Sequence, residues 1–248
     1  MTLRLLPRAA ALGGLLLAGA ALAQGGPLVT DDPGTPGDGH WEINLAAIGS
    51  RTRPQAQLSL PDADINYGWG ERIQLKIDTP WLLAHPAGEG FKTGLGATDL
   101  GVKWRFLGDE DQGLSMSTYP QFSDAFIAST PRRGLSEAGR QFFMPLEAAY
   151  HFGDGFALDG EVGRNVVQFG PDQWVAGVIA SQDCGAGLEC LVEVRERHGG
   201  GQAVLLNLGA RKKLSDSLLL LGAAGREAGP RDDSRLSLLV YLGAQLLL

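Results

Sequence analysis

Residues 72–81 alternate between polar and apolar side chains without a break until Pro80. A β-strand turns successive side chains to opposite faces, so one face of this segment is apolar and the other is charged or amidic. The same period of two recurs along most of the chain, in segments of about 10 residues. Alternating segments of this length, behind an export signal, are typical of a transmembrane β-barrel.

The first 23 residues have the composition of a secretory signal peptide. Arg4 and Arg8 supply its charged region, residues 9–22 supply an apolar run, and Ala21-Leu22-Ala23 is a cleavage motif. The alternative is a membrane anchor, but the apolar run is short and ends in the cleavage motif. We therefore expect export from the cytoplasm and loss of residues 1–23.

The chain is acidic, with 21 lysine and arginine residues against 28 aspartate and glutamate residues and a formal net charge of −7. Loss of Arg4 and Arg8 with the signal peptide would make it more acidic still. Because nucleic acid needs a basic surface, we expect no nucleic-acid partner. The hydrophobic fraction of 44% fits a soluble protein and a barrel equally well, since half of each membrane strand faces a polar lumen.

We divide the exported chain into an irregular lead-in and an all-β barrel of antiparallel up-and-down strands. Residues 24–39 are rich in Gly, Pro and Asp, and we expect them to be solvated in the periplasm, with Asp31 and Asp32 too few to bind calcium. Residues 40–248 form the barrel, with about 12 strands and a possible range of about 10–14. The predicted strands are 40–50, 56–67, 72–81, 97–107, 113–122, 140–152, 155–165, 173–182, 188–197, 202–213, 217–225 and 235–247.

The strand at 217–225 is the weakest of these predictions, because it is apolar on both faces. The connections give a second signal, since short turns and longer loops alternate along the chain. Outer-membrane barrels have short periplasmic turns and longer outer loops, and the predicted short turns fall at the periplasmic positions. The five tryptophans lie near strand ends or on outward faces, which favours a membrane-interface girdle over a soluble core.

Three short motifs resemble a known family. Residues 26–33 (GPLVTDDP) with 39–42 (GHWE), residues 66–68 (NYG) with 71–75 (ERIQL), and residues 99–106 (DLGVKWRF) are similar to the outer-membrane transporter family named for the meta-pathway of phenol degradation. The resemblance covers about residues 26–180. It implies an outer-membrane β-barrel that takes part in solute passage. Because the family name reflects gene context, it does not identify phenol as the solute.

We find no motif that indicates an enzyme. Outer-membrane lipases and lipid A deacylases place a histidine two residues before the nucleophilic serine, and no G-x-S-x-G elbow is present either. The four histidines are His40, His85, His151 and His198, and the residues two positions later are Glu42, Ala87, Gly153 and Gly200. The glycines of residues 94–99 do not match a nucleotide-binding loop, and no helical pattern follows them. We expect no cofactor, no metal site and no catalytic residue.

Cys184 and Cys190 are the only cysteines, and a turn-like sequence separates them. An exported chain meets an oxidising compartment, so we favour a disulfide that clasps a hairpin end. Two free thiols are the alternative. A zinc site is not indicated, because no histidine lies nearby.

The charged faces of the predicted strands would point into the lumen, because charges facing lipid cost several kcal/mol. Basic residues fall on 72–81 and 97–107, and acidic ones mainly on 140–152, 155–165 and 188–197, which predicts one wall of charge against another. We predict that Arg72, Lys76, Lys103 and Arg105 set the ion preference. The alternative is a salt-bridged interior that only holds the barrel shape. The predicted lumen-lining residues are Arg72, Lys76, Asp78, Asp99, Lys103, Arg105, Glu147, Asp159, Glu161, Glu193 and Arg195.

We therefore predict an outer-membrane β-barrel that passes or binds a small solute, hydrophobic or aromatic compounds included, without covalent chemistry. Its expected partners are outer-membrane lipid, the barrel assembly machinery and the solute. The alternative is a soluble periplasmic β-barrel or sandwich that acts as a ligand-binding or structural module. Strands of about 10 residues favour the membrane barrel, since soluble strands average about 5–6.

Overall fold

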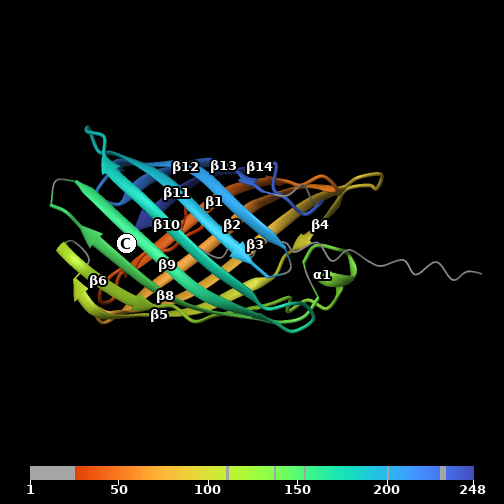
Figure 1. The fold of residues 1–248 in the computed structure, drawn as a ribbon, viewed down its shortest axis with the longest axis horizontal. Helices are drawn as coiled ribbons and strands as arrows, with labels where there is room; N and C mark the ends of the chain where they lie inside the picture. The colour runs from red at the N-terminus through yellow and green to blue at the C-terminus, as the bar shows by residue number, and fades with distance from the viewer. Residues whose placement is uncertain (1–25, 110–111, 137, 154, 200, 230–232) are drawn as a thin grey trace, which may run out of the picture.

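The computed structural model describes residues 26–109, 112–136, 138–153, 155–199, 201–229 and 233–248, and forms one closed antiparallel barrel of 12 strand positions (Figure 1). Strands β1 and β14 pair with each other and close the wall. The predicted signal peptide lies outside the described residues. The first strands are β1 (Trp41–Arg51), β2 (Gln55–Trp69), β3 (Ile73–Pro86), β4 (Lys92–Leu95), β5 (Thr98–Asp109), β6 (Gln112–Thr118) and β7 (Gln121–Asp124). The others are β8 (Gln141–His151), β9 (Phe156–Val167), β10 (Gln173–Asp183), β11 (Leu188–His198), β12 (Gln202–Ser215), β13 (Leu218–Ala228) and β14 (Leu238–Leu247).

Two details differ from the predicted strands. The strand expected at 113–122 is split into β6 and β7, which both pair with β5 and β8 and so occupy one position in the wall. Tyr119 and Pro120 lie between them, and proline has no N–H for the strand ladder. Strand β4 was not predicted; it pairs with the last part of β3, beyond the part that pairs with β5, so β4 and β5 also occupy one position in the wall. Each of the other predicted segments corresponds to one strand of the structure.

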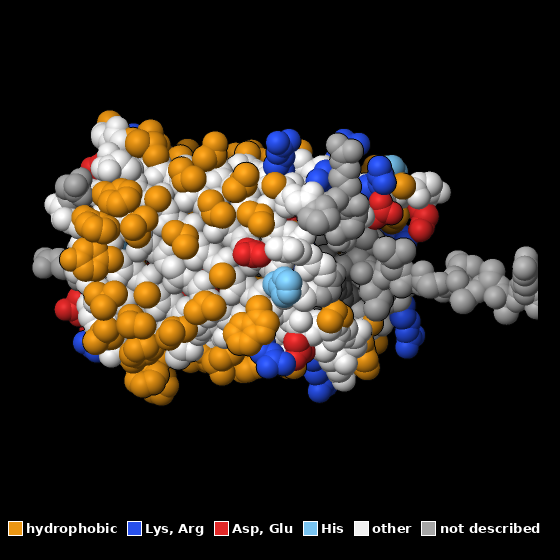
Figure 2. Space-filling view, in the orientation of Figure 1, with side chains coloured by type: hydrophobic (Ala, Val, Ile, Leu, Met, Phe, Trp, Pro, Cys, Tyr) orange, Lys and Arg blue, Asp and Glu red, His pale blue; other side chains and the backbone are white. Residues whose placement is uncertain are grey.

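The outer surface of the barrel is apolar. Along β5, for example, Leu100, Val102 and Trp104 are exposed, while Asp99, Gly101 and Lys103 between them are buried. Figure 2 shows hydrophobic side chains spread over the strand wall, with charged groups gathered mostly near its ends. A soluble barrel would place its apolar face inside, so this arrangement is that of a membrane-spanning barrel and does not support the soluble alternative. Within the described residues, no helix is long and apolar enough to cross a membrane.

The two ends of the barrel are built differently. The turns at 70–72, 184–187 and 216–217 are short and share one end, where β8 also ends and β9 begins. The opposite end carries β4 and the short helix α1 (Ser129–Arg132), which lie close together in Figure 1. There Leu135 packs on Leu82 and Ala84 of β3, so the segment that follows α1 covers part of the rim.

The lead-in is irregular, as predicted, but it is not solvated. Leu28, Val29 and Thr30 are buried, and they lie inside the barrel against residues of β1 and β10–β14. Residues 26–36 therefore occupy the lumen, and the chain reaches the short-turn end before β1 begins. The expectation of a solvated segment was wrong because its polar atoms are bonded to the charged lumen wall, as described next.

Candidate functional site: the barrel lumen

The structure places the predicted lumen residues inside the barrel, with one exception. Arg72 lies in the turn before β3, its side chain is 52% exposed, and it faces Asp109 at 3.9 Å. The alternating pattern began one residue before the strand does, so Arg72 belongs to the rim. The residues with buried or nearly buried side chains are Lys76, Asp78, Asp99, Lys103, Arg105, Glu147, Asp159, Glu161, Glu193 and Arg195.

Glu193 of β11 holds the N-terminal segment by its backbone. Its Oε1 accepts hydrogen bonds from the N–H groups of Val29 at 3.1 Å and Thr30 at 2.5 Å. Its Oε2 accepts one from Asn207 Nδ2 of β12 at 3.2 Å. A carboxylate that is fully buried needs such donors, since each hydrogen bond to a charged group contributes about 1.5–3 kcal/mol.

Lys103 of β5 holds the same segment from the opposite wall. Its Nζ donates to Asp31 Oδ1 at 3.0 Å and also to the carbonyl oxygen of Asp32. The same ammonium lies 3.8 Å from Glu147 Oε2 and 4.7 Å from the ring centroid of Tyr119. Because Lys103 is nearly fully buried, it depends on these contacts to offset the cost of desolvation.

Arg195 of β11 also contacts the segment. Its guanidinium donates to the carbonyl oxygen of Val29 at 3.2 Å and forms an ion pair with Glu161 at 2.5 Å. The N-terminal segment is thus bonded at Val29, Thr30, Asp31 and Asp32 by side chains from β5 and β11. We call this set of contacts from Lys103, Glu193 and Arg195 the latch.

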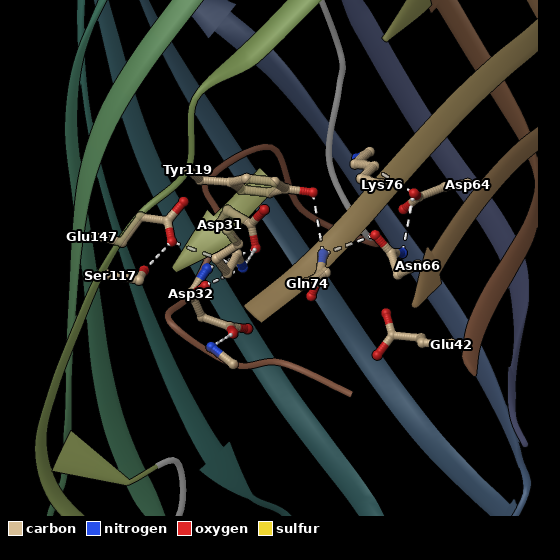
Figure 3. A network of polar contacts seen from close by, with 12 residues as sticks. Asp31, Asp32, Glu42, Asp64, Asn66, Gln74, Lys76, Ser117, Tyr119 and Glu147 are labelled. Atoms are coloured by element: carbon tan, nitrogen blue, oxygen red, sulfur yellow. Dashed lines mark hydrogen bonds and ion pairs between the residues drawn. The ribbon is translucent and has the colours of Figure 1, made fainter. Parts of the chain in front are cut away.

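A second polar network lies on β2 and β3 (Figure 3). Gln74 donates to Asn66 Oδ1 at 2.8 Å and to the hydroxyl of Tyr119 at 3.1 Å. Asn66 in turn donates to Asp64 Oδ1 at 3.1 Å, and Lys76 lies 3.5 Å from the same oxygen. Asp64 and Asn66 could be found in the sequence, because they alternate with apolar residues of the predicted strand 56–67, but unlike Lys76 they were not among the predicted lumen residues.

The charges of this region correct the predicted division into a basic wall and an acidic wall. Lys76 pairs with Asp64 at 3.5 Å and Asp78 at 3.8 Å, and Asp62 and Asp99 are buried on the neighbouring strands. Four carboxylates, on β2, β3 and β5, therefore accompany the ammonium of Lys76. The prediction was wrong because it counted the bases of two strands and left out the aspartates of β2.

The side of the lumen formed by β1 and β10–β14 is mostly apolar, which the sequence analysis did not predict. Inward side chains of β1 and β10–β14 form a continuous cluster that also contains Leu28 and Val29. Burial of a leucine or valine contributes about 1.5–3 kcal/mol, so this packing is comparable to the latch in strength. We call the following residues the apolar wall: Ala46, Ile48, Ile179, Leu191, Leu205, Leu221, Ala223, Leu239 and Tyr241.

Gly177 of β10 lets the segment approach the wall. A Cβ atom at this position would lie 2.0 Å from Thr30 Oγ1 and 2.9 Å from its Cγ2. A Cβ atom does not make non-bonded contacts this short, so a side chain here and Thr30 in its present place exclude each other. The barrel wall is therefore shaped to the N-terminal segment as well as bonded to it.

Cys184 and Cys190 form a disulfide with a Cα–Cα distance of 6.0 Å. It spans the short turn between β10 and β11, and Cys190 lies on the same strand as the latch residues Glu193 and Arg195. The described residues contain no group of three or more His, Cys, Asp or Glu side chains placed to hold a metal ion.

Comparison with models of known protein families gives no match for this chain, and no curated protein matches its sequence significantly. Solved structures are similar in fold. An outer membrane channel from Pseudomonas putida F1 is 12% identical, with a TM-score of 0.68, over 90% of this chain and 100% of that one. The NanC porin is 5% identical, with a TM-score of 0.58, over 83% of this chain and 99% of that one.

The β domain of the Bordetella autotransporter BrkA is also similar, at 13% identity and a TM-score of 0.55, over 84% of this chain and 98% of that one. The fold is therefore that of the outer-membrane β-barrels. Because channels, porins and an autotransporter domain share it, the fold by itself does not specify what this barrel does.

Proposed function

We propose that this protein is an outer-membrane channel that admits a small, mainly apolar solute, aromatic compounds included. The observation that carries the proposal is the apolar wall, which faces the lumen rather than lipid. A path for ions or sugars needs polar groups on all sides, whereas ligand sites for apolar molecules are lined by hydrophobic side chains with a few polar groups. The side of the lumen formed by β1 and β10–β14 has that second composition.

The N-terminal segment stands in the path of such a solute. Leu28 and Val29 cover the apolar wall, so a solute that reaches the wall has to displace them or take their place. An apolar solute would replace the contacts of Leu28 and Val29 with apolar contacts of its own. A hydrophilic molecule could not form such contacts with the wall. This arrangement supports selection of apolar compounds by competition for the wall.

The motif resemblance to the transporter family named for phenol degradation supports the same proposal, as does the fold of the channel from Pseudomonas putida F1. We infer that the chain is inserted in the outer membrane by the barrel assembly machinery, with the short turns in the periplasm. We also infer that it acts without covalent chemistry and without a cofactor. The lumen-lining charges hold the N-terminal segment and the barrel shape in this proposal.

A first experiment tests the location. Outer membranes are isolated, and the protein is run on an SDS gel with and without boiling. A faster unheated band in the membrane fraction is expected for a closed barrel. A single band in the soluble periplasmic fraction would overturn the membrane assignment.

A second experiment tests the solute class. The barrel is folded in detergent and titrated with N-phenyl-1-naphthylamine, whose fluorescence rises in an apolar site, while liposome swelling measures the passage of arabinose. We expect saturable binding of the aromatic probe and slow swelling. Fast swelling without saturable probe binding would identify a hydrophilic pore and overturn the proposal.

A further inference from the structure

Two arginines point outward from the barrel at the end that carries the long loops. Arg51 is the last residue of β1, and Arg226 lies near the end of β13. Both side chains are exposed. On β1 the buried inward residues are Ala46 and Ile48, so Arg51 lies on the opposite, outward face. On β13 the buried inward residues are Leu221, Ala223 and Glu227, so Arg226 also faces outward. Their guanidinium groups therefore stand on the outer side of the wall, where the apolar surface ends.

These arginines flank one residue of β14. Arg51 is opposite Leu238 in the β1–β14 register, and Arg226 follows Gly225, which is opposite Leu239. The two side chains are thus separated by two strand spacings, about 10 Å. Leu238 between them is exposed and also points outward.

Neither arginine pairs with a carboxylate within the described part of the chain. Glu227, the nearest acidic neighbour of Arg226 in sequence, points inward, accepts a hydrogen bond from the Leu236 N–H at 2.7 Å and pairs with Arg197. Asp233 pairs with Arg53 at 3.1 Å. Other outward arginines of the same end do have carboxylate partners: Arg140 with Asp124 at 3.2 Å and Arg164 with Asp172 at 2.5 Å.

The surface below the two arginines is apolar and shallow. Leu45 and Leu242 are exposed there, and between the arginines and these leucines lie Gly49 and Ala224. A Cβ atom at Gly49 would meet no atom within 4 Å, so the surface is open at this point. Acyl chains lie on such a surface, and the guanidinium group of arginine binds phosphate through paired hydrogen bonds.

We propose that Arg51 and Arg226 form a binding site for a phosphorylated lipid of the outer leaflet, with its phosphates on the two guanidinium groups and its acyl chains on the face of β1, β13 and β14. The positive guanidinium groups match the negative phosphates of such a lipid, and the apolar strand face next to them matches its acyl chains. This inference rests on the proposed placement in the outer membrane. It concerns the outer wall and is independent of what passes through the lumen.

The test measures retention of lipid by the folded barrel. Protein in mild detergent is mixed with bisphosphorylated lipid A, with its enzymatically dephosphorylated form or with phosphatidylethanolamine, and bound lipid is counted by native mass spectrometry. We expect a clear preference for the bisphosphorylated lipid. The double variant Arg51→Gln/Arg226→Gln should bind it roughly tenfold more weakly, since each arginine at a lipid surface contributes measurably to binding.

The matched control is Arg140→Gln/Arg164→Gln, which removes two outward arginines that already have carboxylate partners. This control should retain the affinity of the unchanged protein. Heat-modified mobility on an SDS gel confirms that each variant is folded, which separates loss of the site from loss of the membrane barrel. Equal binding of phosphorylated and dephosphorylated lipid, or equal losses in the two double variants, would overturn the inference while leaving the membrane assignment intact.

Discussion

The two walls of the lumen hold the same N-terminal segment by different means. On β2, β3, β5, β8 and β9 many inward side chains are charged or polar, and we call this side the charged wall; from it Lys103 bonds the segment through Asp31 and the carbonyl of Asp32. On β1 and β10–β14 the inward side chains are mostly apolar, and Leu28 and Val29 pack against them. Glu193 and Arg195 bond the segment from within the apolar side.

This difference indicates that the two walls have different roles. Buried hydrogen bonds and ion pairs depend on geometry, so the charged wall and the latch fix where the segment lies. Apolar packing is not directional, so the apolar wall can accept another apolar molecule of suitable size in place of Leu28 and Val29. Variants that act on one wall alone can separate these two roles.

The largest effect is expected from Gly177→Ala, because the new Cβ would lie 2.0 Å from Thr30 Oγ1. The segment should leave its place and lose the latch and the apolar packing together, so single-channel conductance should rise from near zero to a stable open level. Planar bilayer recording measures this change.

The matched rescue is Gly177→Ala combined with Thr30→Gly, which removes each of the Thr30 atoms that would collide. The double variant should be closed again. Gly160→Ala, on the neighbouring strand with no atom closer than 3.9 Å to a new Cβ, should resemble the unchanged protein. An open channel in the rescue variant would show that Thr30 does not carry the effect.

A smaller effect is expected from Glu193→Gln, which keeps the shape of the side chain but removes its charge. The hydrogen bonds to the Val29 and Thr30 N–H groups should weaken by about 2 kcal/mol in total, which corresponds to about thirtyfold more frequent opening. Opening events are counted in the same recordings. Glu196→Gln, an exposed outward change on the same strand, is the control, and equal opening rates in both variants would contradict the role of the latch.

The apolar wall can be tested with a pair of neighbouring leucines. Leu221 faces the lumen and Leu220 faces outward, so Leu221→Asn and Leu220→Asn make the same change on opposite faces of β13. Loss of about one buried leucine should weaken binding of N-phenyl-1-naphthylamine roughly tenfold in the first variant and leave it unchanged in the second. Equal binding in both would mean that the aromatic probe does not use the wall.

The same comparison explains which parts of the lumen could be predicted from the sequence. Alternation locates a strand face only when the two faces differ, so Lys76, Lys103, Glu147 and Glu193 were found by their contrast with apolar neighbours. On β13 both faces are apolar, one toward the outside and one toward the N-terminal segment, and for this reason 217–225 was the weakest strand prediction. The sequence therefore identifies lumen-facing residues only on strands whose two faces differ in polarity.

The N-terminal segment could not be placed from its own residues. Its glycines, prolines and aspartates are equally suited to a solvated segment, and its position depends on donors and acceptors from β5 and β11, more than 70 residues away along the chain. Arg72 was misplaced for a local reason, since the polar–apolar pattern continues one residue into the turn. Strand phase could be predicted, whereas contacts between distant segments required the closed barrel.

The smallest effect is expected for ion preference, and it tests the charged wall alone. Lys76→Met leaves Asp62, Asp64, Asp78 and Asp99 without their ammonium, so the lumen should favour cations more strongly. The reversal potential in a tenfold KCl gradient, measured in the open Gly177→Ala background, should shift by a few millivolts toward the cation value. Arg72→Met removes the same charge from the exposed rim, where water and salt screen it, and should leave the potential unchanged. Equal shifts in the two variants would mean that net charge of the barrel, rather than the arrangement around Lys76, sets the preference.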